Sequence, residues 1–278
     1  MRWKALLVLA MALVLVASGC IGGGTTQTAT PTSQSVQSQT KTQTSSSQAQ
    51  TSTGSENVFD PLKAIEGIWS FAYIENASVA MNVTMSVKNM TEQATSISMQ
   101  ITEEGYIDLR DRTAQINMTT TTFPDNVTVR LQRTVINNTE YLLIPEGCVK
   151  KGNGSYVWTT NPVAIAKWLV QNEEPIAEYR ENESVVLVYS AESDLIMPLA
   201  ELYFTTPGMN LTVLDATVKL VFKNGELARE ELVYSVRATA VTKDSLLGEI
   251  HIEQNGVWKG TIRITSINEK RKVKPPST

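Results

Sequence analysis

The sequence predicts an α+β domain, in which an antiparallel sheet of ten or eleven strands follows one helix and is interrupted by one or two others. Apolar and polar residues alternate with a period of two in many short segments, as is typical of strands that bury one face. Short polar turns separate these segments. Turns of this length join antiparallel strands, because parallel strands require long crossovers.

The first elements follow from capping residues and alternation. Asp60 and Pro61 suit an N-cap and a first helical position, so a short helix is expected over 60–70. The next segment alternates from Val79 to Val87, which predicts a half-buried strand. The same period recurs at 97–101, 114–118 and 127–131.

Two helices are expected within the series of strands. Asn161 followed by Pro162 can cap a helix that ends near Asn172, and a second helix is expected over 193–204. A strand at 185–189 is expected between the two helices.

Strand patterns return in the C-terminal part of the chain. One strand is expected to bury Leu214, Ala216, Val218, Leu220 and Phe222, and the next to bury Leu232, Tyr234, Val236 and Ala238. Asn224-Gly225 between them predicts a type I′ hairpin. Asn255-Gly256 has the same composition and predicts a second hairpin, between strands at 250–252 and 258–264.

Residues 1–19 have the features of a secretory signal. Arg2 and Lys4 precede an apolar run that is too short to span a membrane comfortably. The run ends in Ala17-Ser18-Gly19-Cys20, which resembles the lipobox of prokaryotic lipoproteins, although Ala17 stands where that motif often has Leu. The resemblance implies cleavage before Cys20 and attachment of a lipid to its sulfur. An uncleaved anchor helix and an ordinary signal peptide remain alternatives.

The lipidated cysteine is expected to lead into a flexible linker over 20–57. Of the 37 residues from Ile21 to Asn57, 25 are Ser, Thr or Gln, so this stretch cannot bury enough apolar surface to offset its conformational entropy. The folded domain is then expected over 58–267, followed by a basic, solvated tail over 268–278. The alternative for this tail is that it contacts anionic lipid head groups.

The order of the predicted elements resembles that of LolA/LppX-type lipoprotein and lipid carriers over about residues 59–267. The residues that carry this resemblance are Ser70-Phe71 after the first helix, the Met81–Val87 strand, Gly105-Tyr106-Ile107-Asp108, Tyr141, and Tyr156-Val157-Trp158. The resemblance implies a strongly curved antiparallel half-barrel with helices across its open side. It also implies an apolar ligand, such as a lipid.

Four methionines on the apolar register indicate where such a ligand would lie. Methionine is flexible and polarizable, so it suits surfaces that accept varied apolar shapes. If the sheet is curved, its concave side is expected to bind ligand through Met81, Val83, Met85, Ile97, Met99, Ile101, Ile116, Met118, Val129 and Leu131, with Trp168 and Leu169 closing over it. The alternative is that these side chains meet the inserted helices as a filled core.

Sequons for N-glycosylation are frequent. Nine of them occur, at Asn76, Asn82, Asn89, Asn117, Asn126, Asn137, Asn153, Asn182 and Asn210. Asn82 and Asn117 fall on the polar register of predicted strands, so glycans there would require that face to point to solvent. Glycans on a lipobox protein indicate an archaeal surface. Asparagine and threonine used as ordinary polar strand residues are the alternative.

Signals for enzymatic chemistry are scarce. The single histidine, His251, falls on the polar side of a strand pattern, and the sequence has no His/Cys cluster or calcium-loop spacing. Cys148 is the only cysteine besides Cys20, so no disulfide is expected within the mature chain. The adjacent pairs Glu173-Glu174 and Glu230-Glu231 are expected to be solvated. We therefore expect no enzyme activity, cofactor or metal.

The expected function is that of a lipoprotein held on the extracellular side of the cell membrane, which binds a lipid, acyl or isoprenoid chain without covalent chemistry. The alternative is a filled-core structural or protein-interaction module, working with a surface-layer or transporter protein. A surface hydrolase with clustered carboxylates is a third, less favoured reading. After removal of residues 1–19 the chain has 22 basic and 28 acidic residues, which argues against a nucleic-acid partner.

Overall fold

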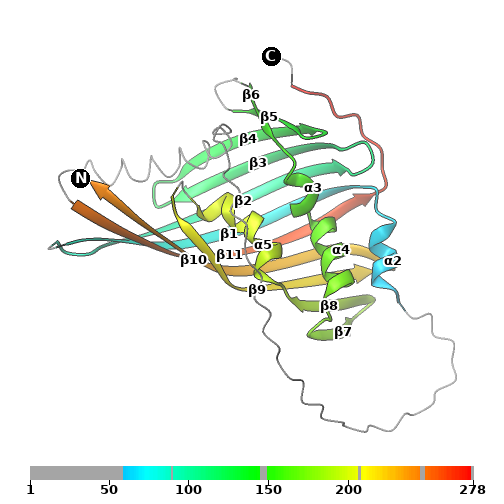
Figure 1. Cartoon of the computed structure of the whole chain (residues 1–278). Helices are drawn as coiled ribbons and strands as arrows, with labels where there is room; N and C mark the ends of the chain where they lie inside the picture. Colours follow the sequence, from blue (N-terminus) through cyan, green and yellow to red (C-terminus); the bar gives the residue numbers. More distant parts are fainter. Residues whose placement is uncertain (1–58, 89, 145–148, 206–207, 245–247, 277–278) are drawn as a thin grey trace, which may run out of the picture.

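The computed structural model describes residues 59–276, apart from residues 89, 145–148, 206–207 and 245–247. The predicted signal, Cys20 and linker therefore lie outside the described residues, as do Asn89 and Cys148. Within the described part, the chain forms one antiparallel sheet of eleven strands together with four helices (Figure 1). No helix in that part is long and apolar enough to cross a membrane.

The elements follow the predicted order. The strands are β1 (Ser70–Val87), β2 (Gln93–Asp108), β3 (Thr113–Phe123), β4 (Val127–Ile136), β5 (Thr139–Leu143), β6 (Val149–Asn153), β7 (Ala177–Glu181), β8 (Ser184–Ser190), β9 (Asn210–Lys223), β10 (Glu226–Asp244) and β11 (Gly248–Ile267). The helices are α2 (Pro61–Glu66), α3 (Val157–Thr160), α4 (Pro162–Asn172) and α5 (Ser193–Phe204). The antiparallel α+β class and the two predicted inserted helices, α4 and α5, are confirmed, whereas the short helix α3 was not predicted.

The sheet consists of two meanders that meet at one long strand pair. Its order is β6-β5-β4-β3-β2-β1-β11-β10-β9-β8-β7, so β1 pairs with β11 and the sheet keeps two open edges, β6 and β7. The β1–β11 register runs from Phe71 opposite Ile267 to Val87 opposite Ile250. Because the strands form an open series, they do not close into a barrel.

Side-chain caps fix the starts of two helices, as the sequence predicts. The Asp60 carboxylate accepts a hydrogen bond from the Lys63 N–H at 3.1 Å, and the Asn161 side chain accepts one from the Ala164 N–H at 2.9 Å. Each cap satisfies a backbone donor that has no partner in the first turn of its helix. Helix α2 ends at Glu66, earlier than expected, because β1 begins at Ser70.

One face of the sheet packs against the helices, and this side is called the inner face below. Its core includes Met99 of β2, Leu169 of α4 and Phe204 of α5, and Figure 1 shows α3, α4 and α5 on the same side of the strands. Asn82 and Asn117 are exposed on the opposite face, since alternate residues of a strand point to opposite sides. Apart from Asn89, every predicted sequon asparagine is exposed.

The predicted buried face of β9 is wrong at Leu214. This side chain is 58% exposed, whereas Val213 is only 4% exposed. The register between β9 and β10 shifts here, because Asp215 pairs with Ser235 and Val213 pairs with Val236. Leu214 is the extra residue of a β-bulge, which reverses the alternation that holds for the rest of the strand.

The predicted hairpin at Asn255-Gly256 is also wrong, because β11 runs without interruption through both residues. Gly256 faces the Phe204 ring, and a Cβ at this position would overlap that ring. Gln254, two residues earlier on the same face, donates a hydrogen bond to the Phe204 carbonyl at 3.2 Å. The glycine therefore lets the end of α5 approach the sheet closely, as glycine within a strand often does. At Asn224-Gly225, by contrast, both φ angles are positive and the hairpin is confirmed.

The basic segment after β11 is held against the domain over its first residues. The Asn268 side chain accepts a hydrogen bond from the Trp69 N–H at 2.8 Å. The Arg271 N–H donates to the Tyr106 hydroxyl at 3.0 Å, and Lys270 forms an ion pair with Asp111 at 2.9 Å.

Replacing Gly256 with alanine should destabilise the protein by about 1–3 kcal/mol, because the added methyl group displaces Phe204 from a closely packed site. Gly67→Ala is the matched control. Gly67 has a φ of −72°, and its nearest neighbour would be 3.8 Å from a Cβ. Denaturant unfolding should show a lower midpoint for Gly256→Ala alone. Equal midpoints for the two variants would contradict the close approach of α5.

Candidate ligand-binding site

The predicted ligand-binding residues divide into two groups in the structure. One group lines a cavity of about 60 Å³ between β2–β4 and α5, and consists of Met99, Ile101, Met118, Val129 and Leu131. Thr120, Thr122 and Val127 of the sheet, together with Leu202 of α5, complete its mostly apolar wall. We call this space the apolar cavity.

The remaining predicted residues do not line the apolar cavity. Met81, Ile97 and Leu169 pack in the hydrophobic core, and Trp168 packs against it. Ile116 lines a neighbouring cavity, whereas Val83 and Met85 line neither space. The predicted ligand-binding residues on β2–β4 therefore line one site, whereas most of the other predicted residues pack in or against the core.

The neighbouring space is a polar cavity of about 70 Å³ beneath the helices. Its sheet wall carries Glu75, Glu103, Arg133, Glu230 and the aromatic residues Tyr73, Tyr234 and Trp258, and its helix wall includes Tyr156, Asn161 and Leu199. Arg133, Leu202 and Tyr203 line both spaces, so the apolar and polar cavities adjoin.

Strand register brings the three glutamates together. Glu75 of β1 pairs directly with Glu103 of β2, and on its other side it pairs with Ile262 of β11. Ile262 in turn pairs with Glu230 of β10. The three carboxyl groups thus lie in one row across the inner face, where Glu75 is 9%, Glu103 8% and Glu230 0% exposed. Burial of carboxyl groups is unfavourable unless they find partners.

Sequence reasoning missed this row of glutamates. Glu230 was expected to be solvated but is fully buried, while only its neighbour Glu231 reaches solvent. The available signal was the alternation itself, since Glu230 precedes Leu232 and Tyr234 on the buried register. Glu103 likewise continues the register of Met99 and Ile101.

Some of the polar groups in the cavity satisfy one another. The Tyr73 hydroxyl donates a hydrogen bond to the Glu103 carboxyl group at 2.5 Å. The Tyr156 hydroxyl donates one to the Glu140 carboxyl group at 2.9 Å. Arg133 lies 3.6 Å from the same Glu140 carboxylate, which provides its counter-charge.

Other polar groups have no hydrogen-bond partner among the described residues. Those that line the cavity are both carboxyl oxygens of Glu230, the Tyr234 hydroxyl, the Trp258 Nε1 and the Arg133 Nε. Buried polar atoms in native proteins are nearly always paired with protein or with a bound molecule. The unpaired atoms of Glu230, Tyr234 and Trp258, called the unpaired set below, therefore indicate that this side of the cavity can bind a polar group.

Burial changes the acidity of all three glutamates. It raises the pKa of Glu230 to about 8. Burial, followed by the nearby charges of Glu103 and Glu230, raises the pKa of Glu75 well above its usual range. Burial also raises the pKa of Glu103, although the hydrogen bond from Tyr73 and the charge of Arg133 oppose this change.

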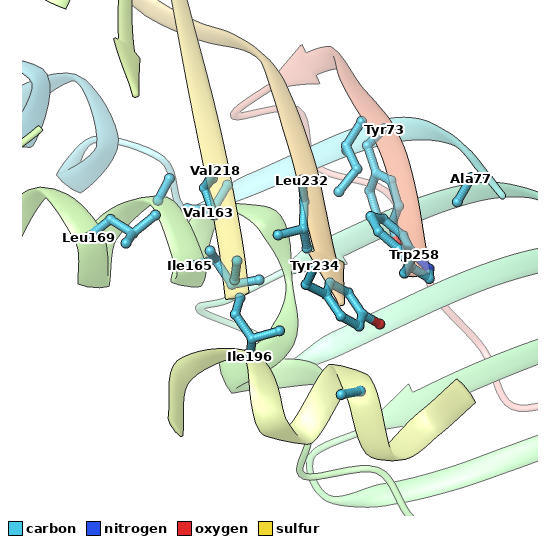
Figure 2. Packing of buried hydrophobic residues seen from close by; sticks show 14 of the residues in the cluster. Tyr73, Ala77, Val163, Ile165, Leu169, Ile196, Val218, Leu232, Tyr234 and Trp258 are labelled. Carbon is cyan, nitrogen blue, oxygen red and sulfur yellow. The ribbon is translucent and has the colours of Figure 1, made fainter. Parts of the chain in front are cut away.

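Aromatic rings shape the polar cavity, and glycines make room for them. Tyr234 and Trp258 stack with ring centres 5.4 Å apart and planes 11° apart. Figure 2 shows them projecting from neighbouring strands, on which these two residues are paired. A Cβ on Gly105 would overlap the Tyr73 ring, and one on Gly260 would overlap the Trp258 ring.

The described residues offer little for metal or nucleophilic chemistry. Among them, no group of three His, Cys, Asp or Glu residues lies close enough to hold a metal ion. His251 is exposed on the face opposite the cavities and pairs only with Glu249, at 2.7 Å. Glu75, Glu103 and Glu230 do cluster at the polar cavity, so the reading as a hydrolase with clustered carboxylates stays a prediction.

Comparisons with known proteins give no family for this chain. No family model matches it, and neither does any curated protein sequence. Some solved structures are weakly similar to this one. One is a β-barrel-like protein with a domain of unknown function from Brucella abortus. Its TM-score is 0.22, and it is 8% identical over 70% of this chain and 98% of its own. A LolA superfamily protein from Nitrosomonas europaea has a TM-score of 0.21 and 8% identity over 74% of this chain and 91% of that one.

A third similar structure is the outer membrane protein OprG from Pseudomonas aeruginosa, with a TM-score of 0.14 and 9% identity over 72% of this chain and 98% of that one. These scores are too low to assign a family. The resemblance to LolA/LppX carriers therefore stays a prediction from the order of the elements.

The buried glutamates predict that stability falls as pH rises. In the unfolded chain Glu230 loses its proton near pH 4.5, but the native state keeps it until about pH 8. The free energy of unfolding should therefore decrease between these values, by on the order of 5 kcal/mol for Glu230 if no bound partner offsets its burial. Glu75 and Glu103 act in the same direction, although the charge of Arg133 and the hydrogen bond from Tyr73 reduce the contribution of Glu103.

Thermal unfolding from pH 4.5 to 8.5 measures this effect. Glu230→Gln should flatten the profile and raise Tm at pH 8. Glu231→Gln is the control, because this neighbour is 33% exposed and ion-paired on the other face. A wild-type protein with constant Tm over the whole range would rule out burial of ionisable carboxyl groups at this site.

Proposed function

We propose that the protein binds an apolar ligand, such as a lipid or an acyl or isoprenoid chain, between the inner face of its sheet and α5. The apolar cavity carries this proposal, because it gathers five of the predicted ligand-binding residues, including Met99 and Met118. In this proposal the open sheet is a curved half-barrel of the LolA/LppX type, with its helices lying across the open side.

A long chain would need more space than the apolar cavity provides. Leu202 and Tyr203 of α5 form the wall shared by both cavities, so outward movement of this helix would join them. Burial of apolar area contributes about 25 cal/mol per Å². A chain of ordinary length could therefore replace the contacts that α5 loses, and flexible methionines would adapt to its shape.

The proposal also concerns the location of the protein. Lipidation of Cys20 would anchor it to the cell membrane, and the linker would hold the domain on the extracellular side. Exposure of the described sequon asparagines supports glycosylation of the face opposite the cavities. Binding would involve no covalent step, and a surface-layer or transporter protein could receive the ligand.

The cavity volumes favour a second candidate function. Ligand pockets for small molecules usually enclose at least about 300 Å³. The two cavities measure about 70 and 60 Å³, as is typical of a largely filled core. On this reading, the domain is a structural or protein-interaction module displayed at the surface.

Filling the apolar cavity separates the two candidates. Thr120→Phe should place a ring in the cavity and weaken uptake of a fluorescent fatty acid at least tenfold. Thr121→Phe is the matched control, because this neighbour points to the opposite face of β3 and belongs to no sequon. Native mass spectrometry of the purified wild type should detect co-purified lipid. If the purified wild type contains no lipid and takes up no fatty acid, ligand binding is excluded and the filled-core module is the remaining candidate.

The anchor has its own test. Cys20→Ser should release the protein from the membrane fraction into the soluble fraction of the producing cells, because the serine oxygen cannot carry the thioether-linked lipid. Cell fractionation and immunoblotting would measure this change. Retention of the variant in the membrane would contradict lipidation and favour an uncleaved anchor helix.

A further inference from the structure

We propose that the polar cavity binds a neutral, hydroxyl-bearing head group, such as the glycerol or alcohol end of a lipid whose chain occupies the apolar cavity. This inference rests on the proposed function and names the class of ligand. It begins from the position of the polar cavity at one end of the apolar one, with Arg133, Leu202 and Tyr203 as the common wall.

The first argument is the unpaired set on the Glu230 side. Glu230 and Tyr234 are 0% exposed and Trp258 is 3% exposed, and all three line the cavity. An unpaired buried donor or acceptor loses its hydration without compensation, which costs about 1–3 kcal/mol for each group. Three such groups at one cavity wall are best explained by a polar molecule that pairs with them.

The second argument is the kind of hydrogen bond that these groups require. Trp258 can only donate, whereas the Tyr234 hydroxyl and the protonated Glu230 carboxyl group can each donate or accept. A ligand hydroxyl donates and accepts at the same time, so a head group with hydroxyl groups can match all three kinds of partner. An ammonium group can only donate, and it would leave the Trp258 N–H unpaired.

The third argument is charge. Glu75, Glu103 and Glu230 face the cavity, and the charge of its one arginine, Arg133, is already opposed by Glu140 at 3.6 Å, although the Arg133 Nε has no hydrogen-bond partner among the described residues. A phosphate or carboxylate head group would be buried without a free cation to balance its charge, because the carboxyl groups around it are either neutral or negative. The cavity therefore selects against anionic lipids.

The size of the cavity limits the head group. A volume of about 70 Å³ is enough for several water-sized groups, because one water needs about 10–15 Å³ on the same measure. A glycerol or simple alcohol end matches this space, but a large glycan head does not. The stacked rings of Tyr234 and Trp258 provide a rigid wall for it.

A set of three lipids with one oleoyl chain tests the inference. The probes are 1-monooleoylglycerol, methyl oleate and oleoyl lysophosphatidate, each used to displace an uncharged fluorescent fatty-acid ester from the full-length protein. Monooleoylglycerol should bind at least tenfold more tightly than either of the others. Equal binding of monooleoylglycerol and methyl oleate would overturn the head-group site but keep the proposed function. Tighter binding of the phosphate probe would also overturn it.

Variants locate the selectivity. Glu230→Leu and Trp258→Phe should each reduce the preference for monooleoylglycerol over methyl oleate about tenfold, while affinity for methyl oleate stays unchanged. Glu231→Gln, on the opposite face, should keep the wild-type preference. Selectivity that survives in folded Glu230→Leu and Trp258→Phe proteins would place the head group elsewhere. If the wild type binds none of the probes, the proposed function itself fails.

Discussion

The pairing of β1 with β11 is the constraint on which the rest of the structure depends. These strands come from the two ends of the folded region, and their register joins two meanders into one sheet. Because side chains alternate between faces, a slip of one residue would turn every inner side chain outward. The same register places Glu75 and Glu230 on either side of Ile262, although they are far apart in the sequence. The same strand register therefore determines both the hydrophobic core and the candidate site.

The inner face combines packing with an unusual polar content. Most of its residues are aliphatic or aromatic and form one continuous core with the helices. Glu75, Glu103 and Glu230 interrupt this core at positions where apolar side chains of neighbouring strands would otherwise pack together. Replacement of buried ionisable groups by apolar residues often stabilises a protein. Retaining three of them at one cavity is consistent with a role in recognition rather than in stability.

Much of the fold could be predicted from local patterns. Caps at Asp60 and Asn161, the alternation in β1–β4, and the Asn224-Gly225 turn act over a few residues, so the sequence displays them directly. The bulge at Leu214 and the uninterrupted course of β11 depend on partners in other elements. Gly256 is a turn residue by composition, but it is a contact residue for Phe204 in the structure. Alternation also placed the residues of the apolar cavity on one face, whereas the polar cavity required knowledge of which strands are neighbours.

An open sheet leaves two edges whose backbone groups could pair with another molecule. The outermost strand β7 is exposed along its whole length and carries Glu178, Arg180 and Glu181, while β6 at the other edge carries Lys151. Charged side chains at such edges discourage strand addition between copies. A protein tethered beside many identical copies would meet them at high local concentration. Charged borders would then keep neighbouring sheets from fusing into a continuous ribbon.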